Sequence, residues 1–290
     1  MKAPEVKKLI ERLIIFFVGI PVVLALVWLP YIRHLPLNIA IFGVSAFAAY
    51  ELSLMFGTNG QTLPRPLLMA LTPLVPLAEY LNVIFGLDYL STIALVLASF
   101  VIFAVEIFTA KEFAMSNARI ARSLCVVLYA GFLPSFITRI SGMEDSFPKL
   151  ATFLVLVFIS DSAAWLFGML FGKNNRGVVL ASPNKSAAGF FGAFLGSFVF
   201  GLLMTMLVFK KEFSDGAFGA NYLVARTAAL SVCVCAAAIV GDLAESVFKR
   251  SAEVKDSGNV ILGRGGVLDS VDSIFMAAPV YFFLVSLLFK

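Results

Sequence analysis

Apolar runs of about 20 residues recur along the whole chain, and this pattern restricts the possible folds more than any other feature. A helix needs roughly 20 mostly apolar residues to cross the hydrocarbon core of a bilayer. The runs lie at approximately 13–29, 36–56, 66–86, 89–109, 120–142, 150–172, 187–209, 223–247 and 270–289. They are too long for barrel strands, and lipid cannot satisfy an interrupted backbone. The sequence therefore predicts an all-α polytopic integral membrane protein with about nine transmembrane helices.

Composition supports this class, because 60% of the residues are apolar and only 14% are charged. A soluble domain could not cover its surface with so few charges. The net charge of +4 is too small to indicate a nucleic-acid partner. The first apolar run lacks a small-residue cleavage site and is followed at once by another run, so we interpret it as a retained helix.

The basic residues predict the orientation through the positive-inside rule. A cytoplasmic N-terminus places most of the 22 Lys and Arg residues on the cytoplasmic side. The same orientation puts the two longest polar loops of the C-terminal half, 173–186 and 248–268, in the cytoplasm. The sequence thus predicts a multi-pass protein of the cell (inner) membrane with a cytoplasmic active face.

The chain divides into two halves of different character. The N-terminal half, 1–145, holds about five spans with few charges inside them. These are Glu51, Glu79 and Glu106, which we interpret as structural residues at helix interfaces or helix ends. The C-terminal half, 146–290, clusters its charges with Gly, Ser, Pro and Asn, and we expect this half to be catalytic.

Proline and glycine predict local features of two spans. Pro73 and Pro76 should kink the third span, since each removes a backbone donor. Gly189, Gly192 and Gly196 form a small-residue face on the seventh span, which favours close helix packing and allows a homodimer.

A cluster of charged residues marks the end of the eighth span and the start of the last. Its members are Asp242, Ser246, Lys249, Arg250, Lys255, Asp256, Gly265, Gly266, Asp269 and Asp272. Carboxylates without His or Cys suit a hard cation such as Mg²⁺ rather than zinc. Glycines beside Lys and Arg suit a polyphosphate, which needs close backbone approach and cationic neutralisation. The residue types predict metal-assisted phosphoryl or nucleotidyl transfer; a solvated juxtamembrane loop would explain Lys249 and Arg250 but not the aspartates.

Two motifs resemble those of one enzyme family. The first reads Ser246-x2-Lys249-Arg250-x4-Lys255-Asp256-x-Gly258, then Gly265-Gly266-x2-Asp269-x2-Asp272. The second reads Asp161-Ser162-x-Ala164, Gly168, Gly172-Lys173, then Ser182-Pro183-x-Lys185-Ser186-x2-Gly189. Both are similar to the motifs of phosphatidate cytidylyltransferases, also called CDP-diacylglycerol synthases, over roughly residues 155–275.

The resemblance implies that the phosphate of phosphatidate, a membrane lipid, attacks the α-phosphorus of CTP to give CDP-diacylglycerol and pyrophosphate. It implies a Mg²⁺ cofactor and allows a second, monovalent cation. By motif position, the implied metal ligands are Asp242, Asp269 and Asp272. The other implied catalytic residues are Ser246, Lys249, Arg250, Lys255 and Asp256. The implied substrate-binding residues are Asp161, Ser182, Lys185, Arg264, Gly265 and Gly266.

The chain departs from the family pattern at four positions. Arg264 replaces a usual His, Ser270 a usual Arg, Leu262 a usual Pro or small residue, and Ala188 a common Glu. We expect Arg264 to supply the cation that is missing at Ser270. The loss of a Glu at Ala188 has no evident substitute in the sequence.

Two other functions remain open from the sequence. A cytidylyltransferase or kinase for another membrane lipid or a polyprenol could use the same residues. An ion-coupled transporter could also bind ions at intramembrane carboxylates, but transporters usually repeat their broken helices in both halves. Here the polar residues gather in one half, which disfavours a transporter.

Overall fold

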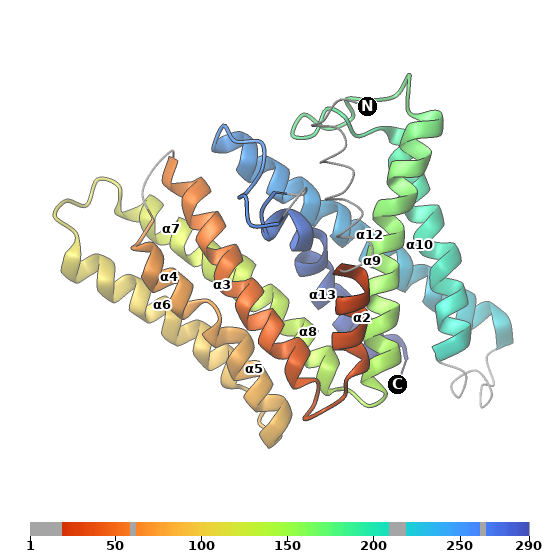
Figure 1. The fold of residues 1–290 in the computed structure, drawn as a ribbon, viewed down its shortest axis with the longest axis horizontal. Coiled ribbons are helices and arrows are strands. Elements are labelled where there is room, and N and C mark those ends of the chain that lie inside the picture. Colours follow the sequence, from red (N-terminus) through yellow and green to blue (C-terminus); the bar gives the residue numbers. More distant parts are fainter. Residues whose placement is uncertain (1–18, 59–61, 209–218, 262–264, 290) are drawn as a thin grey trace. The chain divides into compact units, whose positions relative to one another are not determined.

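The computed structural model describes residues 19–58, 62–208, 219–261 and 265–289 (Figure 1). Regular structure within these residues is helical, apart from two isolated β-bridges. The helices are α2 (Ile20–Trp28), α3 (Leu35–Thr58), α4 (Arg65–Leu71), α5 (Leu74–Phe85), α6 (Leu90–Thr109), α7 (Ser116–Val127), the π-helical η2 (Leu128–Phe132), α8 (Leu133–Gly142), α9 (Ser146–Phe171), α10 (Ala187–Val208), α12 (Gly219–Ser251) and α13 (Leu268–Leu288). The predicted all-α class is confirmed.

Eight helical segments of the described residues are long and apolar enough to cross a membrane. They are Leu35–Gly57, Arg65–Phe85, Leu90–Thr109, Ser116–Ser141, Ser146–Phe171, Ala187–Val208, Leu223–Ser251 and Leu268–Leu288. Their outward side chains include large apolar groups such as Phe100 and Phe108 of α6. The first predicted run, 13–29, is described only from residue 19 and contains α2. The prediction of a polytopic membrane protein is confirmed.

Two of these segments are interrupted where the backbone departs from α-helical geometry. In the second segment α4 ends at Leu71 and α5 begins at Leu74, because Pro73 has no N–H to continue the ladder. The carbonyl oxygen of Thr72 at this break faces Gly131 of η2, where a Cβ would lie only 2.7 Å from it. The helix is therefore interrupted at Thr72 and Pro73, where it packs against a π-helical turn, whereas Pro76 lies within α5.

The described helices form two compact units. The first comprises residues 1–143 and 248–271, apart from those outside the described ranges. Within it, Glu79 pairs with Arg139 (Oε1 to Nε, 2.9 Å) and Glu106 accepts a hydrogen bond from Arg119 (Oε1 to Nε, 2.9 Å). These two glutamates are structural, as the sequence predicted.

The second unit comprises residues 144–247 and 272–290, again apart from those outside the described ranges. Figure 1 shows α9 and α10 side by side in this unit, joined by the loop 172–186. The last helix packs on α9, where the Tyr281 hydroxyl donates to the carbonyl oxygen of Lys149 at 2.7 Å. The predicted division into a 1–145 half and a catalytic 146–290 half stays a prediction, since compactness does not say which part is catalytic.

The small-residue face of α10 is covered by α9 of the same chain. A Cβ at Gly192 would lie 2.4 Å from the Cβ of Phe167, and one at Gly196 would lie 2.6 Å from the Cβ of Ala163. Close helix packing is thus confirmed. Because the face is filled within the chain, it does not provide the dimer contact that the sequence suggested, and the homodimer stays a prediction.

Candidate functional site

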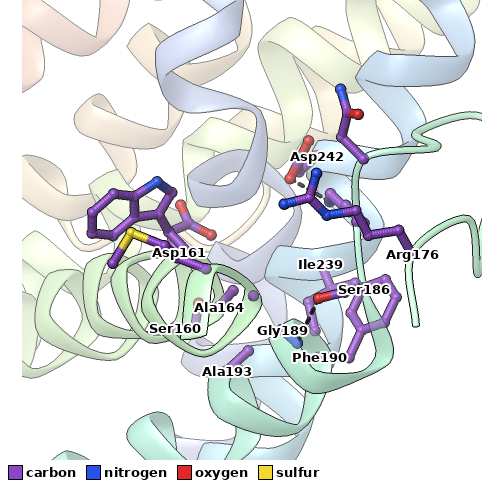
Figure 2. Close-up of a pocket in the computed structure, with 15 residues that line it drawn as sticks. Ser160, Asp161, Ala164, Arg176, Ser186, Gly189, Phe190, Ala193, Ile239 and Asp242 are labelled. Carbon is purple, nitrogen blue, oxygen red and sulfur yellow. Dashed lines mark hydrogen bonds and ion pairs between the residues drawn. The ribbon is translucent and has the colours of Figure 1, made fainter. Parts of the chain in front are cut away.

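A cavity of about 410 Å³ lies in the second unit, between α9, α10, α12 and the loop 172–186 (Figure 2). Its charged and hydroxyl-bearing lining residues are Ser160, Asp161, Arg176, Lys185, Ser186 and Asp242. Apolar side chains such as Trp165 and Phe190 complete the wall. The lining thus combines two carboxylates and two cations with an apolar surface, as an amphiphilic phosphate compound would require.

An ion pair between Lys185 and Asp242 lies in this cavity. Figure 2 shows the guanidinium of Arg176 reaching toward Asp242, while Asp161 extends from α9. The Lys185 and Asp242 side chains are 23% and 37% exposed. Both groups therefore stay accessible to a charged ligand, and the pair itself adds little to stability.

The loop that carries Lys185 is held by its own backbone. Arg176 and Ser186 form an antiparallel β-bridge, and the N–H of Gly177 donates to the carbonyl oxygen of Lys185 at 3.1 Å. Ser186 is the N-cap residue of α10, since its hydroxyl accepts the N–H of Gly189 at 3.0 Å. Gly172 leaves room for that hydroxyl, because a Cβ there would lie 2.6 Å from it. The second sequence motif therefore builds this loop and aims Lys185 at the cavity.

A second polar cluster, the Asp269 cluster, lies in the first unit and consists of Lys249, Ser257, Gly266 and Asp269. Oδ1 of Asp269 lies 2.7 Å from Nζ of Lys249. Oδ2 accepts hydrogen bonds from the backbone N–H groups of Ser257 (2.9 Å) and Gly266 (2.7 Å). Asp269 is 9% exposed at its side chain, so these contacts compensate for most of its lost hydration.

The glycine pair beside Asp269 is required by the close approach of neighbouring groups. Gly265 has φ +113°, a backbone conformation that residues with a side chain rarely adopt. A Cβ at Gly265 would also lie 2.6 Å from Oδ2 of Asp269. A Cβ at Gly266 would lie 2.0 Å from the hydroxyl of Ser257. The pair therefore lets the backbone wrap the carboxylate, while the close approach to a ligand that the sequence indicated stays a prediction.

Glu51 of α3 also contacts the Asp269 cluster, which the sequence did not predict. Its side chain is buried, and it accepts hydrogen bonds from the N–H groups of Val267 and Leu268, both at 2.8 Å. It also accepts one from the hydroxyl of Ser257 at 3.0 Å. The signal in the sequence was a carboxylate in an apolar run, which we interpreted as structural only.

The remaining residues of the first motif have different environments. Asp272 is buried on α13, where its carbonyl oxygen lies 2.4 Å from the position of a Cβ on Gly241 of α12. Ser246 is half-buried on α12, and Arg250 at the end of that helix is exposed. Lys255 and Asp256 are also exposed, and Asp256 lines a smaller cavity of about 280 Å³ together with Arg65.

Two predicted substrate residues lie elsewhere. Ser182 is half-buried and forms a turn with Lys185, but it does not line the described cavity. Arg264 and Leu262 lie outside the described residues. Arg176 does line the cavity, although the sequence did not single it out as a site residue.

The donor atoms of both clusters suit a hard cation. Each predicted central carboxylate, Asp242 and Asp269, already has one oxygen beside a lysine ammonium, which shows that positive charge is accommodated there. Over the described ranges, no group of three or more His, Cys, Asp or Glu side chains is placed to hold a metal ion. Mg²⁺ commonly binds one or two carboxylates and completes its shell with water and phosphate oxygens, so the carboxylates present fit this ion.

Comparison with known proteins adds a family to this geometry. The sequence profile of the cytidylyltransferase family matches residues 10–288. The chain belongs to the cytidylyltransferase family. It is therefore a polytopic membrane member of that family, and both polar clusters lie within the matched residues.

Several curated relatives are similar over about two thirds of the chain. The phosphatidate cytidylyltransferase of Staphylococcus epidermidis is 34% identical over 185 residues, which are 64% of this chain and 65% of that protein. That of Staphylococcus haemolyticus is 32% identical over 195 residues, 66% of this chain and 69% of that protein. That of Staphylococcus aureus strain COL is 32% identical over 186 residues, 64% and 66% respectively. The alignment thus spans slightly less than two thirds of the S. epidermidis protein.

Proposed function

We propose that this chain is a phosphatidate cytidylyltransferase, which condenses CTP with phosphatidate to give CDP-diacylglycerol and pyrophosphate. The observation that carries the proposal is the Lys185–Asp242 pair in a cavity with charged and apolar walls, in a membrane protein of this family. A carboxylate beside an accessible cation suits a phosphate substrate and a divalent metal together. The names of the relatives support phosphatidate as the lipid substrate.

The reaction replaces one phosphoanhydride bond of CTP with another. An anionic oxygen of the phosphate of phosphatidate attacks the α-phosphorus of CTP and forms the new P–O–P bond. The bond from the α-phosphorus to the bridging oxygen breaks, and pyrophosphate leaves with that electron pair. A phosphate monoester is already anionic near neutral pH, so the protein needs little general-base help and contributes mainly positioning and charge neutralisation.

The cationic side chains of the two clusters are suited to that neutralisation. Lys185 and Arg176 line the cavity of the second unit, and Lys249 lies in the Asp269 cluster of the first. Arginine can hold a phosphate through two parallel hydrogen bonds, whereas lysine acts as a point charge. We assign Arg176 to orientation of a phosphate and the lysines to neutralisation of developing charge.

The carboxylates proposed to hold Mg²⁺ are Asp242, Asp269 and Asp272. Mg²⁺, when bound, neutralises phosphate charge and makes the α-phosphorus more electrophilic. Asp242 and Asp269 each form an ion pair with a lysine, so positive charge is accommodated beside both carboxylates. A second, monovalent cation and a homodimer also remain proposals.

The decisive test uses CTP labelled either in its α- or in its γ-phosphate, incubated with purified protein, phosphatidate and Mg²⁺. Cytidylyl transfer carries only the α-label into the lipid, whereas a kinase carries only the γ-label. Transfer of the α-label to a polyprenol phosphate but not to phosphatidate would overturn the proposed substrate. Chelation of Mg²⁺ should stop the transfer, and its restoration should return it.

Orientation is tested by cysteine labelling in cells. In a background lacking Cys125, Cys233 and Cys235, a cysteine replaces either exposed Asn259 or exposed Asp88. Because CTP is made in the cytoplasm, Asn259→Cys should resist an impermeant thiol reagent until the cells are opened. Asp88→Cys should label in intact cells, and the reverse pattern would contradict a cytoplasmic active face.

A further inference from the structure

We infer that Glu51, from the N-terminal half of the chain, is a positioning residue for Asp269. The inference rests on the proposed function and adds to it a role for a helix outside both motifs. Glu51 is 1% exposed, and both of its oxygens face residues of the Asp269 cluster or the start of α13. A buried carboxylate is costly unless it is fully hydrogen-bonded, so this arrangement fixes those residues firmly.

The contacts of Glu51 define where α13 begins. Oε1 accepts the N–H of Val267 and Oε2 accepts that of Leu268, the first residue of the helix. The first N–H groups of a helix have no partner within it, and a negative charge there is favourable. Asp269 is the next residue along α13, so the position of its carboxylate depends on this cap.

A second path runs through Ser257. Its hydroxyl lies 3.0 Å from Oε2 of Glu51 and 2.9 Å from Oδ2 of Asp269. Its backbone N–H donates to the same oxygen of Asp269. The hydroxyl has one proton, which it donates to one of these two carboxylates at a time, so Ser257 links Glu51 to the oxygen of Asp269 that the backbone also holds. The other oxygen of Asp269 faces Lys249.

Two motif glycines are explained by the same carboxylate. A Cβ at Gly258 would lie 2.6 Å from Oε1 of Glu51, and one at Gly266 would lie 2.5 Å from Oε2. The loop thus passes directly over the carboxylate. The two other buried glutamates of this half differ, because Glu79 and Glu106 contact arginine side chains rather than the motif loop.

The test compares Glu51→Gln with the matched control Glu79→Gln. Glutamine keeps the length of the side chain but loses one acceptor, so one of the two backbone N–H groups loses its partner. Loss of a charge-assisted hydrogen bond corresponds to about 10- to 150-fold. We expect amide hydrogen exchange at Val267 and Leu268 to accelerate on that scale in Glu51→Gln, together with a comparable loss of kcat/KM. Glu79→Gln should lower Tm but leave both the exchange at these amides and kcat/KM of the folded protein unchanged.

A double-mutant cycle distinguishes a positioning role of Glu51 from a purely structural one. If Glu51 acts through Ser257, the combined loss in Glu51→Gln/Ser257→Ala should be smaller than the product of the two single losses. Ser257→Ala combined with Glu79→Gln should give simple multiplication. Multiplicative losses in both pairs would overturn the positioning role.

A second variant perturbs the same contact from the loop that faces Glu51. It keeps the inference testable if Glu51→Gln folds poorly. Gly258→Ala places a methyl group against Glu51 and should reproduce the faster exchange and the lower kcat/KM. Gly43 lies on α3, as Glu51 does, and a Cβ there meets nothing within 4 Å. Gly43→Ala should therefore leave both the exchange and kcat/KM unchanged. Unchanged exchange in Glu51→Gln or Gly258→Ala would overturn the anchoring, and normal kcat/KM with fast exchange would overturn the positioning role. An inactive wild-type protein would contradict the proposed function instead, while the exchange measurement would still decide the anchoring.

Discussion

Lys249 places its ammonium 2.7 Å from Oδ1 of Asp269, while the backbone of the motif loop holds the other oxygen of that carboxylate. One oxygen is thus fixed by N–H groups that cannot leave, and the other faces a cation on a flexible side chain. A lysine can move aside for a divalent ion, because its charge sits on four rotatable bonds. The asymmetry gives Asp269 one oxygen held by the backbone and one oxygen that faces a flexible cationic side chain.

Asp269→Asn should reduce kcat by about 100-fold or more, the scale seen when a preorganised charge is removed from a reacting phosphate or oxyanion. Asparagine retains one oxygen for the N–H groups of Ser257 and Gly266, so the loop should keep its fold. Its amide nitrogen cannot pair with Lys249 or bind a cation. The measurement is the initial rate at saturating CTP, with exposed Asp88→Asn as control. Near-normal turnover in Asp269→Asn would show that this carboxylate is not essential.

Lys185→Gln should lower kcat/KM for CTP by about 10- to 150-fold, as expected for loss of a charge-assisted contact. The melting temperature should change little, because both members of the Lys185–Asp242 pair are partly exposed. The exchanged pair Lys185→Asp/Asp242→Lys can restore the ion pair but not a carboxylate at position 242. If that double variant regained activity, the pair would be structural rather than part of the reaction.

His34 predicts a pH dependence of stability. Burial lowers the pKa of this imidazole below 6.5, although a hydrogen bond with the backbone of Val27 opposes the shift. The folded state therefore binds fewer protons than the unfolded state between the two pKa values. Its contribution to stability is complete above about pH 6.5 and is lost as the pH falls toward the lowered pKa, by at most about 1.4 kcal/mol per pH unit.

The single histidine of the sequence makes this effect easy to isolate. Thermal unfolding in detergent should give a constant Tm from pH 8 to about pH 6.5 and a falling Tm at lower pH. His34→Asn should have a lower Tm than the wild-type protein, but its Tm should fall less steeply with pH below about pH 6.5. An equal slope in both proteins would assign the pH dependence to carboxylates instead.

Gly192→Ala should destabilise the second unit by about 1–3 kcal/mol, as overpacked cores do. Its Cβ would meet the Cβ of Phe167 and lie 2.8 Å from the carbonyl oxygen of Ala163, so α10 would have to move away from α9. The measurement is the unfolding midpoint in detergent. Gly43→Ala, with open space around it, should keep or raise that midpoint, and equal effects at both positions would contradict tight packing.

The transmembrane helices were predictable from the sequence because length and apolarity alone decide what crosses lipid. The predicted run 187–209 corresponds to Ala187–Val208, and 89–109 corresponds to Leu90–Thr109. Pro73 also marked its break, since a missing N–H acts locally. These features depend on residues within one segment, which a single sequence displays.

The partners of buried charges were not predictable in this way. Glu51 meets Val267 across 216 residues of chain, and nothing local separates it from Glu79, whose partner is an arginine. Arg176 lines the cavity because its β-bridge with Ser186 closes the loop. The sequence shows that Arg176 is a cation in a loop, but it does not show this bridge. Charge in an apolar run signals that a partner exists, but only the fold says which one.

Glycines of α10 let its backbone approach the backbone of α9 without intervening side chains. Main-chain atoms therefore set the distance between these two walls of the cavity. A Cβ at Gly189 would lie 2.9 Å from the carbonyl oxygen of Ala164, one turn along α9 from the wall that carries Asp161. Replacing a lining side chain would therefore alter the chemistry of the chamber without altering its width. Substitutions at Trp165 or Phe190 can consequently change which ligand the cavity prefers, while the distance between α9 and α10 stays the same.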